Sequence, residues 1–345
     1  MKNKLTYSFM FGLLILTSLL SLALGAVQIP ITEVIKLLLQ KIGFSFTPIE
    51  PQFETILFVV RLPRVVMSLL IGAALGIAGA SIQAIFRNPL AEPGLLGISA
   101  GASLMAVIII VLQTTFFTAL GNLFGYFLVS IGALTGALLT AFLIYKLANT
   151  NGKPQIATML LIGIAINALC TALTGLITAN AEETELRSIT FWMLGSLSGA
   201  TWQLIYAICP FIILALIYLP LQAKKLNAFV LGEAQAEQLG VKTLNVKRKV
   251  IFFSTIAVGA SVAVSGIIGF VGLLIPHLVR LLVGVDNKYV VPMSAILGAS
   301  VLCLSDLLSR LITAPIEQPI GVITALLGSP VFLYILLRDK KKISI

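Results

Sequence analysis

The chain contains few charged residues. Asp, Glu, Lys and Arg make up 10% of its 345 residues and the mean hydropathy is +1.07, whereas soluble domains carry about a quarter charged residues. This shortage excludes an ordinary soluble protein, and no segment between the apolar runs is long enough for a soluble domain. The short alternating strands of a membrane β-barrel are also absent from the sequence pattern.

Histidine and cysteine are scarce as well. His277 is the only histidine, which excludes a metal cage of several histidines within one chain. Cys170, Cys209 and Cys303 lie apart inside apolar runs, a pattern that favours small buried side chains over metal ligands. The sequence also lacks Walker A, GxSxG and HExxH motifs. We therefore expect no catalytic residue, no metal site and no covalently bound cofactor in this chain.

Long apolar runs recur along the whole chain. Most are long enough for a membrane-spanning helix, which needs about 20 residues. The sequence predicts an all-α polytopic membrane protein with about ten transmembrane helices, forming a single transmembrane domain over residues 1–345. The runs lie at residues 5–26, 62–85, 95–113, 122–147, 155–178, 203–221, 249–265, 266–283, 290–312 and 320–337.

Three stretches depart from this pattern. The run 5–26 follows two lysines and could be read as a signal peptide, but its length favours a retained first helix. The segment 27–60 is too polar to span and predicts an interfacial loop or short helix. The run 266–283 contains three glycines and Pro276, which predicts a short or broken helix whose freed backbone groups are covered by other protein.

The net charge of +10 reports membrane topology. The basic residues lie in short loops without interleaved aromatic residues, which argues against a nucleic-acid partner. With the N-terminus inside, most of the 23 basic residues are cytoplasmic, and both termini are then cytoplasmic. The six exceptions are Lys36, Lys41, Arg61, Arg64, Arg187 and Arg310.

An offset of 187 residues aligns two parts of the chain with each other. Identical pairs include Arg61 with Arg248, Gly72 with Gly259, Ala73 with Ala260, Gly79 with Gly266, Pro89 with Pro276, and Gly97 with Gly284. This predicts a first repeat core at 61–150 and a second at 248–337. Because the first copy starts outside and the second inside, the repeat is inverted, as in many transporters.

The segment 222–248 is the longest polar stretch, and we expect it to be a cytoplasmic loop. Residues 228–239 predict a short amphipathic helix, with Glu233 and Glu237 one turn apart and Gly240 as its stop. The alternative is an ordinary solvated loop. A helix lying flat at the membrane surface could instead dock into a groove on a soluble partner.

Several motifs in this order resemble one transporter family. They are RLPRVV (61–66), RNPLAEPGLLGISAGA (87–102), FWMLGSL (191–197), LGEAQAEQLGV (231–241), GFVGLLIPHLVR (269–280) and PIGVITALLGSPVFLYILL (319–337). Together they cover most of the chain and resemble the FecCD-type permease family of binding-protein-dependent ABC importers, which carry ferric siderophores, haem and vitamin B12.

The resemblance implies the fold and partners of a type II ABC importer permease in the cytoplasmic membrane. Such a permease is a homodimer surrounded by lipid, with two cytoplasmic ATPase subunits that use ATP and a substrate-binding protein outside. The coupling residues implied are Leu231, Gly232, Glu233, Ala234, Glu237, Gln238, Leu239 and Gly240. The topology and the repeat add secondary cytoplasmic contacts at Arg87, Asn88, Pro89, Glu92, His277 and Arg280.

The resemblance also implies a translocation path near the run 155–178, where Ile162, Asn167 and Thr171 are expected to line or gate it. For Asn167, a hydrogen bond between helices is an equal alternative. Glu92 could stabilise the start of the following helix electrostatically or meet a basic partner, and the former is preferred.

Outer arginines are expected to dock the binding protein. Arg61 and Arg310 match family positions that meet acidic residues, and Arg187 is a further candidate. Snorkelling competes for Arg61, and an ion pair with Asp306 competes for Arg310.

Cargo and energy source remain open at this stage. The motif NPLAEPGLLG resembles haem and vitamin B12 members of the family more than siderophore members, and RSITFWMLGSL resembles haem permeases, so haem is the favoured cargo. A secondary transporter is the alternative, because Asp306 lies within an apolar run and could relay protons.

Overall fold

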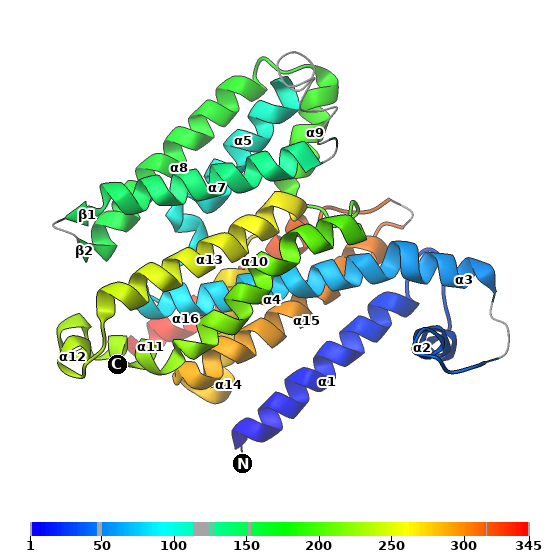
Figure 1. The fold of residues 1–345 in the computed structure, drawn as a ribbon, viewed down its shortest axis with the longest axis horizontal. Helices are drawn as coiled ribbons and strands as arrows, with labels where there is room; N and C mark the ends of the chain where they lie inside the picture. Colours follow the sequence, from blue (N-terminus) through cyan, green and yellow to red (C-terminus); the bar gives the residue numbers. More distant parts are fainter. Residues whose placement is uncertain are drawn as a thin grey trace.

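Long helices run roughly side by side in the computed structural model, which describes residues 2–46, 50–112, 125, 127–150, 153–314 and 316–343 (Figure 1). Eight of the described helical segments are long and apolar enough to cross a membrane. They contain α1 (Lys2–Ala23), α4 (Leu62–Phe86), α7 (Phe127–Leu147), α8 (Ile156–Thr178), α10 (Trp202–Leu221), α13 (Thr243–Ser265), α15 (Asn287–Leu311) and α16 (Ile320–Ile343). With the shorter apolar helices α5 (Ile98–Leu112) and α14 (Val271–Val283), these agree with the predicted ten.

Short elements join these helices. The polar segment 27–60 forms α2 (Ile31–Gln40), α3 (Pro51–Thr55) and the start of a π-helical turn η1 (Ile56–Arg61), so short helices are present as predicted, and α3 and η1 continue into α4. The others are a 3₁₀ turn η2 (Pro93–Leu96), α9 (Glu183–Leu194), α11 (Ala223–Val230) and α12 (Glu233–Gln238), with the antiparallel strands β1 (Asn149–Thr150) and β2 (Lys153–Pro154). The start of the predicted run 122–147 lies outside the described residues except for Gly125.

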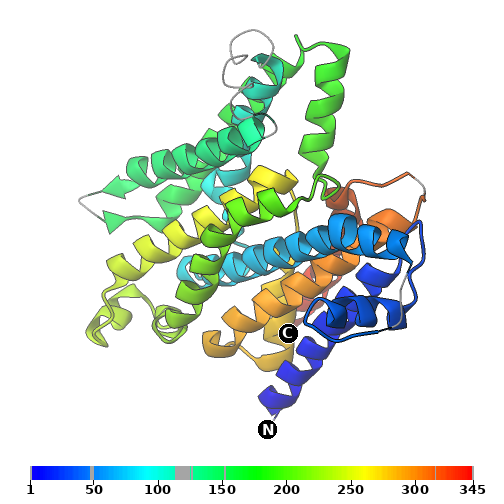
Figure 2. The ribbon, with the colours of Figure 1, turned by 45° about the vertical axis from the view of Figure 1, so that its right-hand side comes forward.

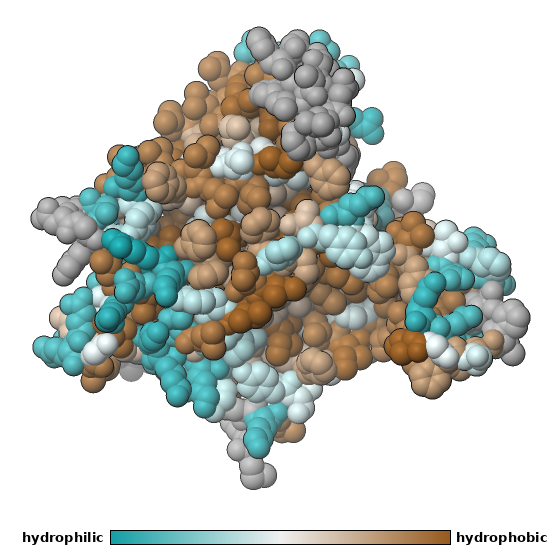
Figure 3. Space-filling view, viewed as in Figure 1, coloured by the Kyte–Doolittle hydropathy of each residue, from teal (hydrophilic) through white to brown (hydrophobic). Residues whose placement is uncertain are grey.

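The connections gather at two ends of the bundle. One end, called the inner face here, holds the N-terminus, the strand pair, α11, α12 and the start of α13 (Figure 2). The opposite end, called the outer face, holds α2, α3 and the start of α4. Hydrophobic surface lies between these ends, and hydrophilic residues gather over α11 and α12 and around α2 (Figure 3). This distribution suits a bilayer-spanning bundle.

The core is centred on α4 and α15, which touch through residues without bulky side chains. A Cβ on Gly72 would overlap the carbonyl oxygen of Gly298, and a Cβ on Gly76 would overlap that of Ser294. The two backbones approach this closely because small residues replace ridges of larger side chains. Most of α4 is buried, whereas few residues of α8 and α16 are buried.

The predicted inverted repeat would relate α4 to α13, which pack side by side and run in opposite directions. The residue-by-residue match holds only in part. Pro89 lies in the connection after α4, whereas Pro276 lies inside α14. Likewise Gly79 is inside α4, while Gly266 ends α13 with a φ of +68°. The second copy therefore breaks before the first, and the aligned prolines do not occupy equivalent structures.

The predicted break in the run 266–283 is confirmed. Residues 266–270 are non-helical, with Phe270 in the left-handed region at φ +67°, and α14 begins at Val271. The neighbouring connection covers part of the freed backbone, because the Ser196 N–H donates to the Ser265 carbonyl at 2.8 Å. Another segment of the chain thus pairs a backbone carbonyl at the helix interruption, as is required inside a membrane.

Candidate coupling segment and translocation path

The predicted coupling helix is two helices. The expectation of one helix over 228–239 is wrong, because Gly232 adopts φ +113° and separates α11 from α12. A side chain at this φ would be strained, so glycine permits the bend. Gly240, at φ +81°, does end the segment as expected. We call residues 222–240 the coupling segment.

Two glutamates of the coupling segment point back to α13. Glu233 forms an ion pair with Lys247 at 2.5 Å, and Glu237 accepts a hydrogen bond from the Thr243 hydroxyl at 2.5 Å. These contacts fix α12 on the start of α13. The residues left at the surface include Leu231 and Leu239, which are 61% and 65% exposed. Ala234, Gln238 and Gly240 are exposed beside them.

The other half of the coupling segment is anchored inward. Leu226 and Phe229 of α11 are fully buried, and α11 packs against α4 and α15. Asn227 adds hydrogen bonds to Asp286 and Asn287 at the start of α15. The sequence reasoning missed Asn227, although a polar residue between two buried apolar positions of a helix was the available signal.

The predicted secondary contacts occupy the inner ends of α4 and α14. Arg87 and Pro89 are exposed, and Arg87 ends α4 in the left-handed region at φ +50°. Asn88 accepts a hydrogen bond from the Leu90 N–H, which closes a local turn. His277 is half-buried on α14.

Arg280 forms a side-chain hydrogen bond to a neighbouring helix, whereas the Glu92 side chain makes no cap hydrogen bond. Arg280 donates to Gln83 of α4 at 2.5 Å, while the Gln83 amide donates to the Leu273 carbonyl at 3.0 Å, so α14 is tied to α4. Glu92 occupies the N-cap position of η2 without a side-chain cap hydrogen bond. Burial raises the pKa of the Glu92 carboxyl above its ordinary value.

A cavity of about 750 Å³ lies along α8. Asn167 and Thr171 line this cavity, whereas Ile162 packs against the hydrophobic core. The Asn167 amide also donates to the Gly94 carbonyl at 3.3 Å, a hydrogen bond between α8 and η2. Within the described residues, the Asn167 Oδ1 and the Thr174 hydroxyl have no hydrogen-bond partner. Both atoms are buried within residues that line the cavity.

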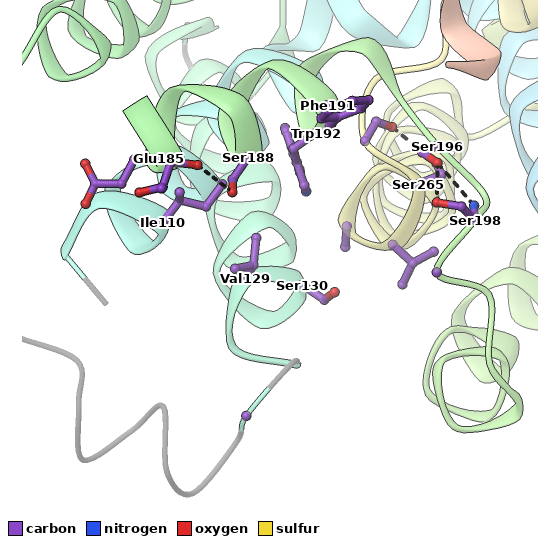
Figure 4. Close-up of a pocket in the computed structure, with 16 residues that line it drawn as sticks. Ile110, Val129, Ser130, Glu185, Ser188, Phe191, Trp192, Ser196, Ser198 and Ser265 are labelled. Carbon is purple, nitrogen blue, oxygen red and sulfur yellow. Dashed lines mark hydrogen bonds between the residues drawn. The ribbon is translucent and has the colours of Figure 1, made fainter. Parts of the chain in front are cut away.

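A second cavity, of about 690 Å³, lies on the other side of α9 at the outer face (Figure 4). Ser188 and Trp192 of α9, Ser130 of α7 and Ser265 of α13 contribute to its wall. Leu186 and Met193 of the same helix line the first cavity. The helix α9 therefore lies between the two cavities. Ile189 is the one buried residue of this helix, all of whose residues the structure describes.

Arg61 is buried, with only 5% of its surface exposed, and the expectation of an accessible docking arginine is wrong for it. Its guanidinium donates to the carbonyls of Leu22 at 2.6 Å and Ala23 at 2.8 Å, and also to that of Val27. These carbonyls lie at and just beyond the end of α1, where a helix leaves its last acceptors unpaired. Arg61 therefore caps α1, and it does not snorkel either.

Arg310 leaves only 9% of its side chain exposed and belongs to an ion-pair cluster. It lies 3.3 Å from Asp306 and donates to the Ser21 hydroxyl at 2.7 Å. Asp306 is fully buried and pairs with Arg64 at 2.9 Å, and Arg64 also pairs with Glu317 at 2.8 Å. The predicted Asp306–Arg310 pair is confirmed, and exposed docking by Arg310 is wrong because its charge is already neutralised. We call Arg64, Asp306, Arg310 and Glu317 the charge cluster.

Arg187 is the predicted outer arginine that is exposed. It lies on α9 with its guanidinium 5.9 Å from the centre of the Phe191 ring. No ion pair joins it to the neighbouring glutamates within the part of the chain that the structure describes. Of the three arginines, Arg187 keeps the accessible charge that docking needs.

Comparison with known proteins identifies the family to which this chain is similar. The model of the FecCD transport family matches residues 13–338. The hemin transport system permease protein HmuU of Yersinia pestis is 41% identical over 82% of this chain and 83% of that protein. The iron(3+)-hydroxamate import permease FhuG of Bacillus subtilis is 36% identical over 95% of each chain. The cobalamin import permease BtuC of Halobacterium salinarum is 38% identical over 84% of this chain and 74% of that protein.

A solved structure agrees with these relatives. An inward-facing conformation of a transporter of the metal-chelate ABC type has a TM-score of 0.80 and 30% identity, covering 96% of this chain and 99% of that one. The relatives are transporter permeases rather than enzymes. This chain belongs to the FecCD transport family and is a multi-pass permease of the ABC importer type.

Proposed function

We propose that two copies of this chain form the membrane pore of an ATP-driven importer for an iron chelate, with haem as the favoured cargo. Two ATPase subunits bind the inner face, which is cytoplasmic, and a substrate-binding protein delivers the chelate to the outer face. The observation that carries this proposal is the coupling segment, which presents Leu231 and Leu239 to solvent beside two helices that enter the membrane. Exposed apolar residues on a polar face suit a protein partner.

The homodimer is supported by the exposure of α8 and α16. Their large apolar side chains at the surface include Leu161, Leu169 and Leu176 on α8 and Leu326, Leu333 and Leu337 on α16. Pairing two chains along α8 would bring their open cavities towards one another. A shared chamber of this kind has the mostly apolar wall and few polar groups typical of ligand sites.

Alternating access is supported by the position of α9. Cavities on both sides of this helix leave it room to shift, while the α4–α15 core is closely packed. Movement of α9 and α8 would expose the chamber to one face at a time. A proton-driven mechanism lacks support, because Asp306 is held between two arginines.

Haem is favoured because a hemin permease is among the most similar relatives, at 41% identity. The test is uptake into proteoliposomes containing the permease, its ATPase and its binding protein. ATP-dependent uptake of haem, with weak competition by ferric hydroxamate or cobalamin, is expected. Uptake of one of the competitors instead would correct the cargo, and uptake without ATP would refute the importer mechanism.

The coupling surface has its own test. Leu231→Asp and Leu239→Asp should abolish binding of the ATPase, because each places a charge in an apolar contact. Val285→Asp is the matched control, since Val285 is 74% exposed just before α15, outside the coupling segment. Equal ATPase binding by all three variants would remove this surface from the interface.

A further inference from the structure

A hydrogen-bonded cluster joins the coupling segment to α15 at the inner face. Asn227 of α11 donates from Nδ2 to the Asp286 carboxylate at 2.7 Å. Its Oδ1 accepts from the Asn287 backbone N–H at 2.8 Å and from the Asn287 Nδ2 at 3.0 Å. Asn287 is the first residue of α15 and is 3% exposed. One side chain of α11 thus makes three hydrogen bonds to the start of another helix.

These bonds complete the N-terminal cap of α15. The first N–H groups of a helix have no partner within it. Asp286 satisfies the Lys288 N–H at 2.9 Å, and Asn227 satisfies the Asn287 N–H from a different element. The hydrogen bond from Asn227 also lowers the pKa of the Asp286 carboxyl, which favours the charged form beside the helix start. The cap of α15 therefore depends on where α11 lies.

The same helix reaches the opposite side of the membrane. Its 25 residues extend over about 37 Å at 1.5 Å per residue. Near its outer end, Asp306 joins the charge cluster, in which Arg64 belongs to α4 and Glu317 precedes α16. A displacement at the inner end of α15 would therefore be carried to the connection that leads into α16.

We propose that Asn227 is a positioning residue through which movement of the coupling segment reaches α15. The proposal rests on the proposed function, since the movement is supplied by the ATPase. The glutamates of α12 attach the same segment to α13, so the coupling segment joins two membrane helices and displaces them together.

An exchange of two side chains tests the proposal. Asn227→Asp places two carboxylates at hydrogen-bond distance, which repels α11 from the start of α15. Adding Asp286→Asn removes this repulsion and restores the hydrogen bond between α11 and the start of α15 with the donor reversed. In this double variant the amide at position 286 donates to the carboxylate at position 227, which still accepts from the Asn287 N–H, whereas the Lys288 N–H loses the oxygen that it shared with Asn227. The control is Asn245→Asp, at an exposed position in the first turn of α13.

The readout is uptake per ATP hydrolysed in complexes that contain equal amounts of ATPase. The wild-type protein tests the proposed function, and only the differences among variants test this inference. N227D should lower the ratio by about two- to thirty-fold, the range of coupling changes seen along transmission paths. The double variant should recover it and N245D should retain it. Equal ratios for N227D and N245D, or no recovery in the double variant, would overturn the proposal.

A distance measurement covers the case in which N227D fails to assemble. Spin labels at Lys224→Cys on α11 and Val285→Cys before α15 would be placed in a background without the native cysteines. Both positions are exposed. The distance should stay constant when ATP binds to the complex with Asn227 intact and should change or broaden in N227A. A distance that shifts equally in both would refute the link.

Discussion

The charge cluster predicts a large and specific loss of stability when Arg64 is replaced. Arg64→Met leaves Asp306 fully buried with Arg310 as its remaining partner. Removing one member of a buried ion pair costs about 3–5 kcal/mol, because the other charge stays desolvated. The Arg310 contact at 3.3 Å offsets part of this cost. We therefore expect the free energy of unfolding to fall by about 2–4 kcal/mol.

The other members of the charge cluster set the internal controls. Glu317 is 41% exposed, so its pair with Arg64 is screened and Glu317→Gln should cost no more than about 1 kcal/mol. Lys41 and Glu54 form a pair with exposures of 61% and 53%, and Lys41→Met should likewise cost no more than about 1 kcal/mol. Asp306→Asn should cost about as much as Arg64→Met, because it leaves Arg64 and Arg310 close together.

The assay is reversible unfolding in mixed detergent micelles, followed by far-ultraviolet circular dichroism. The double variant R64M/D306N should lose clearly less than the sum of the two single losses, since the effects of substitutions within one buried network are not additive. Equal losses of unfolding free energy in R64M and K41M would refute burial as the reason that the Arg64 ion pair contributes more than an exposed pair. Strict additivity of R64M and D306N would refute the direct pairing.

Three further outcomes follow from the packing and from the inner face. Gly298→Ala should lower the free energy of unfolding in micelles by about 1–3 kcal/mol, because the added Cβ would overlap α4. Gly175→Ala is the control, since Gly175 has open space around it, and it should change this free energy by less than about 0.5 kcal/mol. Comparable losses in the two variants would contradict the close approach of α4 and α15. Gly232→Ala should weaken ATPase binding measured by co-purification, because φ +113° strains alanine, while Gly43→Ala at φ +105° on the outer side should not. The free energy of unfolding of the wild-type protein should fall as the pH rises above the ordinary pKa of glutamate, because burial raises the pKa of Glu92 in the folded state and disfavours its charged form. Glu92→Gln should lack this fall. Parallel pH profiles of the two proteins would refute a contribution from Glu92.

The sequence predicts the membrane architecture because hydropathy is a local property. Ten apolar runs, the short helices of 27–60 and the break before Val271 all depend on neighbouring residues. The coupling segment was only partly predictable, since helical periodicity continues through Gly232 and hides the bend at that residue. Local patterns locate such elements but not the angle between them.

The charge cluster was harder to predict because its members meet only through tertiary packing. Arg64 is separated from Asp306 by 242 residues in the sequence. Arg61 lies three residues before Arg64, and its partners are the carbonyls at the end of α1, which no sequence motif marks. The available signal was Asp306 itself, because an acidic residue within an apolar run needs a charged or hydrogen-bonding partner. Their positions at outer helix ends made Arg61 and Arg310 look exposed.

The packing of α4 against α15 limits which helices can move during transport. Their backbones touch at Gly72 and Gly298, and the charge cluster fixes their outer ends together. Helices in such close contact cannot slide past one another without losing both sets of contacts, so they must move as one body. Elements with few buried contacts open at lower cost, and α8 and α9 are of this kind. Force applied to the coupling segment would therefore shift the α4–α15 pair as a unit, and the gate would open where α8 and α9 meet the cavities.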